Sequence, residues 1–93
     1  MLTGRRTVTS TAAKIFVTPT DERSDVGIQI FAGSGNTADV YVSSNSAITA
    51  NVDDDTDGYP LAANDKILIT ERDPNDLYMI SPTGSQTIWF VVQ

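Results

Sequence analysis

The sequence predicts an all-β protein: a small antiparallel β-sandwich or barrel of about seven short strands. Stretches in which apolar and polar residues alternate recur every 8–14 residues along the 93-residue chain. Gly, Pro, Asn and Asp separate these stretches, as turn residues do between antiparallel strands. No long window shows the 3.6-residue apolar period of an amphipathic helix.

We expect residues 1–12, MLTGRRTVTSTA, to form an extended N-terminal arm, because they are small, polar and rich in threonine. A β-sandwich domain at residues 13–93 follows this arm. Its expected strands, in order, are 13–18, 25–31, 38–43, 47–52, 65–71, 77–81 and 86–93. Alternation in the strand at 25–31 places Val26, Ile28 and Ile30 on one face.

The last expected strand, QTIWFVVQ, is apolar on both faces. Ile88, Phe90 and Val92 form one face, and Trp89 and Val91 form the other. Such a strand lies in the centre of a sheet, or a neighbour or another subunit covers its outer face. The sequence leaves both alternatives open.

Size and charge limit the possible partners. A cysteine-free chain of this length builds one modest core and often relies on assembly for stability. Its net charge of −6 argues against a nucleic-acid partner. The charge is uneven: residues 1–14 contain three bases and no acid, or +3, and the rest contains three bases and twelve acids, or −9. No apolar run reaches the ~20 residues that cross a bilayer, so no membrane partner is expected.

The residue types argue against an enzyme. Without histidine or cysteine, the chain lacks the parts of Ser-His-Asp and Cys-His catalysis and of most zinc sites. The only lysines, Lys14 and Lys66, lie at strand edges, where exposure leaves an ordinary pKa. The carboxylates gather in turns. We therefore predict no catalytic residues and no cofactor.

The acidic segment DDDTDG, which starts at Asp53, matches the opening of a calcium-binding EF-hand loop. Its twelfth position is Asn64 where an EF-hand needs glutamate, and expected strands replace the flanking helices. It is therefore no EF-hand, and we predict no metal ligands. A looser alternative, in which Asp53, Asp55 and Asp57 share one Ca²⁺, stays open beside a solvated acidic turn.

Three segments, SDVGIQIFAGSGNTADVYVSSNSAITAN, DGYPLAANDKILIT and DLYMISPTGSQTIWFVVQ, resemble a class of small tailed-bacteriophage virion proteins. The shared strand and turn patterns fall at Ile28–Ile30, Val40–Thr49, Asp57–Ile69, Leu77–Gly84 and Thr87–Val92. The resemblance covers about two thirds of the chain, from Asp25 onward. The extra aspartates before Gly58 and the turn AAND at 62–65 depart from the class pattern.

This resemblance implies a capsid decoration (cement) protein with a β-sandwich fold. Such a protein is made in the host cytoplasm and sits on the outer surface of the virion capsid. Its partner is the major coat protein, whose neighbouring subunits it bridges to stabilise the shell, typically as a homotrimer.

We expect the arm to bind the coat through Arg5, Arg6, Thr7 and Thr9. An extended segment can add a strand to an exposed sheet edge, and arginine pairs with carboxylates through two hydrogen bonds. We expect Trp89 or Phe90 to line the interface between subunits. The alternatives are a disordered terminus with incidental charge and, for the last strand, an ordinary sandwich core.

Two other functions stay open. One is a receptor- or glycan-binding domain of a phage fibre or tail, which predicts exposed aromatic side chains near Asp53–Tyr59. The other is a head-completion or connector component that forms a ring at one vertex.

Overall fold

The computed structural model describes residues 2–16, 18–21 and 23–93. The first sheet contains β1 (Leu2–Val8), β8 (Gln86–Val92), β3 (Ile28–Ala32) and β6 (Lys66–Ile69), in that spatial order. The second sheet contains, also in spatial order, β2 (Ala13–Lys14), β7 (Tyr78–Ile80), β4 (Val40–Ser43) and β5 (Tyr59–Leu61). One short 3₁₀ helix, η1 (Pro74–Asp76), precedes β7.

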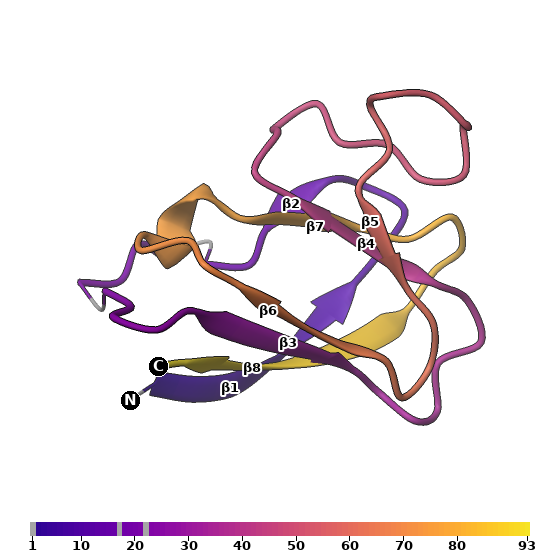
Figure 1. Ribbon diagram of the computed structural model, residues 1–93. Helices are drawn as coiled ribbons and strands as arrows, with labels where there is room; N and C mark the ends of the chain where they lie inside the picture. Colours follow the sequence, from indigo (N-terminus) through magenta and orange to yellow (C-terminus); the bar gives the residue numbers. More distant parts are fainter. Residues whose placement is uncertain (1, 17, 22) are drawn as a thin grey trace.

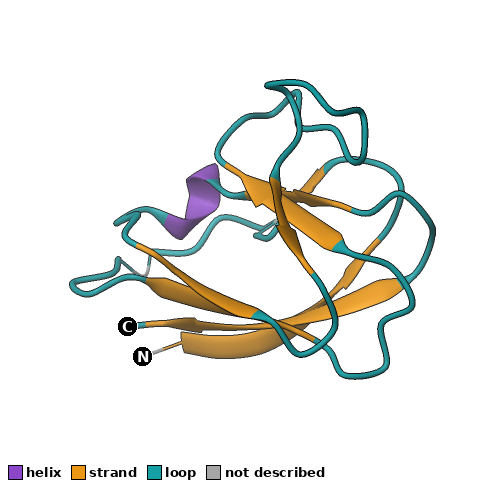
Figure 2. Cartoon of the chain, turned by 45° about the vertical axis from the view of Figure 1, so that its right-hand side comes forward, coloured by secondary structure: helices purple, strands orange, loops and turns teal. Residues whose placement is uncertain are grey.

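The two sheets form two layers, and every strand pairing within them is antiparallel (Figures 1 and 2). The predicted all-β, sandwich-like class is confirmed, and the sheets do not close into a barrel. Among the described residues, none belongs to a helix with the length and apolar character needed to span a bilayer.

Side chains from both sheets meet in a single core. The buried apolar residues that form this core are Val8, Ile15, Phe16, Ile28, Ile30, Ala32, Val40, Val42, Leu61, Leu77, Met79, Ile88, Phe90 and Val92. The strands that supply most of them alternate strictly, as in β3, where Ile28 and Ile30 are buried and Gln29 is half-buried. Burying one large apolar side chain stabilises a fold by about 1.5–3 kcal/mol, so this core is the main source of stability.

The strand prediction is wrong in several details. Of the expected strand 13–18, only Ala13–Lys14 is a strand and residue 17 lies outside the described residues, and β5 (Tyr59–Leu61) was not expected. Residues 47–52 form no strand, only a bridge between Thr49 and Asp57, because Asn51 has a φ of 61° and cannot continue an extended run. Val26 is 61% exposed, because Gly27, at a φ of 153°, interrupts the alternation before Ile28.

The expected arm is also corrected, because residues 2–8 are a strand of the domain's own sheet. β1 pairs with β8 in an unbroken antiparallel register from Leu2–Val92 to Val8–Gln86. β1 therefore lies at an edge of the first sheet, and β8 lies between β1 and β3. The last strand is central, which was one of the two alternatives left open by its sequence.

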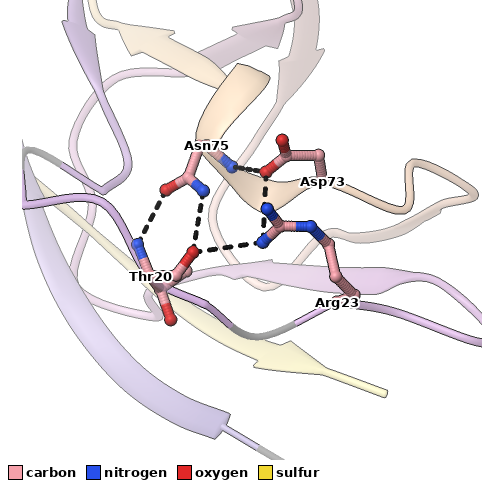
Figure 3. A network of polar contacts seen from close by, with 4 residues as sticks. All are labelled: Thr20, Arg23, Asp73 and Asn75. Atoms are coloured by element: carbon pink, nitrogen blue, oxygen red, sulfur yellow. Dashed lines mark hydrogen bonds and ion pairs between the residues drawn. The ribbon is translucent and has the colours of Figure 1, made fainter.

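Polar side chains fix the long connection before β3 onto η1 (Figure 3). The Asn75 amide donates to the Thr20 carbonyl and accepts from the Thr20 N–H, both at 2.9 Å. Arg23 donates to the same carbonyl at 3.1 Å and lies 3.8 Å from the Asp73 carboxylate. Asp73 in turn caps η1 by accepting from the Asn75 N–H. This connection is held by backbone-directed hydrogen bonds more than by the exposed ion pair.

Candidate functional site

The outward side of the first sheet carries two rows of side chains that cross all four strands. The strand registers align Arg5, Trp89, Phe31 and Lys66 in one row, and Thr3, Val91, Gln29 and Leu68 in the next. Thr7 and Thr87 lie opposite one another at one end. We call these ten residues the outer face.

Large apolar side chains are exposed on the outer face, at Trp89 on the central strand β8 and at Leu68 on the edge strand β6. Trp89 is 51% exposed and Leu68 is 47% exposed. The Arg5 guanidinium carbon lies 6.0 Å from the centre of the Trp89 ring, within the range of a cation–π contact. An open hollow of about 320 Å³ lies beside Trp89, where Thr3, Gln29, Phe31 and Val91 form part of its wall. The outer face thus combines an aromatic centre, a shallow recess and polar groups.

The outer face is positively charged in an acidic protein. It contains Arg5 and Lys66 and no acidic residue, so its formal charge is +2. Because the whole chain carries −6, the rest of the chain carries −8. A separation of charge of this kind favours association of the outer face with a negatively charged surface.

Phe90, predicted to line a subunit interface, is buried inside the sandwich, and Arg6, predicted to bind the coat, is half-buried at the end of the core. The Arg6 guanidinium carbon lies 4.9 Å from the Phe90 ring centre and 5.3 Å from the Phe16 ring centre. Its Nε donates to the Ile15 carbonyl at 2.7 Å, and its Nη1 donates to the Arg5 carbonyl at 2.9 Å. Arg6 therefore covers one end of the core through contacts within the chain, and its predicted role in coat binding stays a prediction.

Phe90 is 5% exposed and packs edge-to-face against Phe16, with ring centres 4.9 Å apart. Its assignment to a subunit interface is corrected, because alternation along β8 points Phe90 inward and Trp89 outward. The neighbouring strand makes room for the ring with a glycine: a Cβ on Gly4 would lie 2.8 Å from the Phe90 Cζ.

The other predicted residues divide between two places. Arg5, Thr7 and Trp89 lie together on the outer face, although the sequence analysis had assigned them to two different interfaces. Thr9 lies beyond β1, where its carbonyl accepts from the Ser81 N–H at 2.9 Å. Phe31 and Lys66 also lie on the outer face, although the sequence did not indicate them as site residues. Alternation within their strands predicts which face each side chain occupies, but only the register between strands places them in one row with Arg5.

The acidic segment belongs to the loop between β4 and β5, on the side of the molecule away from the first sheet (Figure 1). The Asp57 carboxylate accepts from the Thr49 hydroxyl at 2.8 Å and from the Asp53 N–H at 2.9 Å. It also accepts from the Val52 N–H at 3.1 Å. Burial raises the pKa of Asp57, but these hydrogen bonds outweigh it and leave the pKa below its usual value.

Asp57 therefore holds the loop together from inside. Within the part of the chain that the structure describes, no three acidic, histidine or cysteine side chains converge so as to hold a metal ion. Gly58 allows the loop to pack closely against β4, because a Cβ at this position would lie 2.6 Å from Ile48 Cδ1 and 2.9 Å from the Val42 backbone.

We predict that Asp57→Asn lowers the melting temperature at pH 7. A carboxyl whose folded-state pKa is depressed stabilises the fold above its unfolded-state pKa of about 4, and this stability is lost as the pH falls through the folded-state pKa. The difference from the wild type should therefore shrink below about pH 4. Thermal melts from pH 2 to pH 7 would measure it. Asp55→Asn, in the same loop, is the control and should leave the melting temperature at pH 7 unchanged.

The fold and the outer face define a small all-β domain with one cationic, aromatic sheet surface. Comparisons of the chain with protein-family models, curated proteins and solved structures find no match. The geometry of the outer face and the sequence patterns described above are therefore the features from which a function can be inferred.

Proposed function

We propose that this chain is a phage capsid decoration (cement) protein, which binds the outer surface of the coat lattice and bridges neighbouring coat subunits. The observation that carries the proposal is the outer face, where Trp89 lies directly between Arg5 and Phe31 in the strand register. The resemblance to small virion proteins supports the same function.

The outer face has the composition of an energetically strong contact. Trp and Arg are the residues that most often dominate binding free energy when they are buried at the centre of an interface. Trp89 is one of the two central residues of its row, so a partner bound to the row buries its exposed side chain. Arg5 and Lys66 stand at the two ends of the row and pair with carboxylates of the coat.

Charge separation sets the orientation of the bound protein. The outer face, at +2, turns toward an acidic coat surface, and the remaining −8 faces the solvent. Like charge on the solvent side discourages further layers from forming. Because exposed charges are screened within about 8–10 Å at 0.1–0.15 M ionic strength, binding should weaken as salt rises.

A protein that binds the coat through several copies of the outer face binds more tightly than one with a single copy. A homotrimer remains part of the proposal, because three linked faces raise the effective concentration of the second and third contacts. Arg5 and Trp89 share one surface, so we assign that surface to the coat, and the trimer assembles through other surfaces. Light scattering of the free chain tests the trimer.

Quantitative mass spectrometry of purified particles tests the proposed function. We expect the chain in the particle, at a copy number that scales with that of the major coat protein. A copy number that matches a single ring at one vertex would support a head-completion component. Absence of the chain from the particle would contradict the proposal.

One observation favours the glycan-binding alternative. Tyr59 is 60% exposed and Val52 is 54% exposed, and they flank the acidic segment where this alternative predicts exposed aromatic side chains. A glycan array separates the two functions, since a decoration protein binds shells and no sugar. Saturable binding of one glycan, lost in Tyr59→Ala, would favour the alternative.

A further inference from the structure

We infer that the free edge of β1 is a strand-addition site that takes an extended, acidic segment of the partner protein. This inference rests on the proposed function, which makes the partner the coat. It reverses the role first expected of this segment: β1 receives a strand from the partner instead of donating one.

Backbone directions identify the free groups of the edge. In an antiparallel strand, the N–H and C=O of one residue point to one side and those of the next residue point to the other. The Thr87 carbonyl of β8 accepts from the Gly33 N–H at 2.9 Å, on the β3 side, so Ile88 and Phe90 bond toward β1. Their partners on β1 are Arg6 and Gly4.

The backbone groups of Thr3, Arg5 and Thr7 therefore point away from β8, along the free edge. The Arg5 carbonyl already accepts from the Arg6 Nη1, so the inference rests on the N–H groups of the three residues and on the carbonyls of Thr3 and Thr7. β1 contains no proline and no bulge, and its seven residues pair with β8 without interruption. β6, at the opposite edge of the first sheet, has only four residues. A long, regular edge strand of this kind is a ready template for another strand.

The charged side chains beside the edge determine which kind of strand binds there. Arg5 is exposed on the outer face, and the Arg6 guanidinium donates to the Arg5 carbonyl, which points along the edge. Both charges are positive. A two-fold pairing of β1 with a second copy, centred on Arg5, would oppose two like charges, which is destabilising. A segment that places a carboxylate beside Arg5 gains a charge-assisted hydrogen bond instead. The edge thus fits an acidic strand better than its own copy.

Proline at position 3 tests the inference. Because the Thr3 N–H points to the free edge, Thr3→Pro removes an edge donor and no hydrogen bond to β8, and proline is tolerated at such positions. Thr3→Val keeps the N–H and the β-branched shape, so it is the matched control. The measurement is equilibrium binding to purified shells stripped of this protein, with circular dichroism to verify folding. We expect Thr3→Pro to bind about tenfold or more weakly than Thr3→Val, since the two variants share the loss of the hydroxyl and differ in the edge N–H.

A second measurement applies even if Thr3→Pro does not fold. In the wild-type protein bound to shells, the amides of Thr3, Arg5 and Thr7 should gain protection from hydrogen exchange. Unchanged exchange at these amides would overturn the inference. Equal shell binding by Thr3→Pro and the wild type would overturn it too, and would leave the proposed function standing.

Two further results would overturn the inference in other ways. If Arg5→Glu binds shells as tightly as the wild type, the partner segment is not acidic. If the free chain self-associates and Thr3→Pro abolishes this, the edge belongs to a second copy. Failure of the wild type to bind shells at all would overturn the proposed function together with the inference.

Discussion

Replacing Phe90 with alanine is expected to lower the free energy of unfolding by about 3–5 kcal/mol. The ring is 5% exposed and lies on the central strand of the first sheet. Its loss leaves a cavity beside Phe16 and removes the surface on which the Arg6 guanidinium rests, 4.9 Å away. A domain of 93 residues has a total stability of about 5–14 kcal/mol, so this one substitution removes a large share of it.

Urea unfolding followed by circular dichroism measures this loss. Trp89→Ala is the matched control, because it removes a larger aromatic side chain from the next position of the same strand. Trp89 is 51% exposed, so its removal should cost far less stability than the removal of Phe90. Equal losses in the two variants would show that the two rings do not differ in burial.

For shell binding, we expect Trp89 to be the important residue, whereas for stability it is Phe90. Trp89→Ala should weaken binding to stripped shells about 100-fold, or by about 2.8 kcal/mol, because it removes the aromatic centre of the outer face. Arg5 also loses the ring that it contacts at 6.0 Å. Binding isotherms from co-sedimentation would measure the change.

Tyr59→Ala is the control for this second prediction. Tyr59 is 60% exposed, more than Trp89, but it belongs to the second sheet. Its removal should leave shell binding unchanged. Loss of binding in Tyr59→Ala with retention in Trp89→Ala would move the docking surface to the β4–β5 loop.

The fold class was predictable because alternation is a local signal. Ile28 and Ile30, or Val40 and Val42, report a buried face within five residues of sequence, and the structure buries all four. The role of the acidic segment was harder to predict. Its repeated aspartates suggest a cation, but the structure gives one of them, Asp57, an internal role through hydrogen bonds to Thr49 and to backbone groups.

β1 was not predictable from its own residues. Its inward positions are Leu2, Gly4, Arg6 and Val8, so two of the four lack an apolar side chain. Gly4 fits because a side chain at that position would collide with the Phe90 ring. Arg6 fits because its guanidinium packs on two aromatic rings and donates a hydrogen bond to the Ile15 carbonyl. Both reasons lie in residues distant in sequence, and no local pattern contains them.

The candidate site was only half predictable for the same reason. Arg5 and Trp89 were each recognised as residues able to bind a partner, but they were placed on different interfaces. Only the antiparallel register between β1 and β8 makes them neighbours. Alternation alone places Trp89 and Phe90 on opposite faces of β8, but which of the two faces is buried follows from how the two sheets pack.

Oxidative footprinting of Trp89 on the intact particle tests the docking surface most directly. Trp89 is the only tryptophan of the chain, so its oxidation is read from a single peptide by mass spectrometry. We expect rapid oxidation in the free protein and strong protection on the particle, with Tyr59 oxidised equally in both. Equal oxidation of Trp89 in the free and particle-bound protein would show that the outer face does not bind the shell.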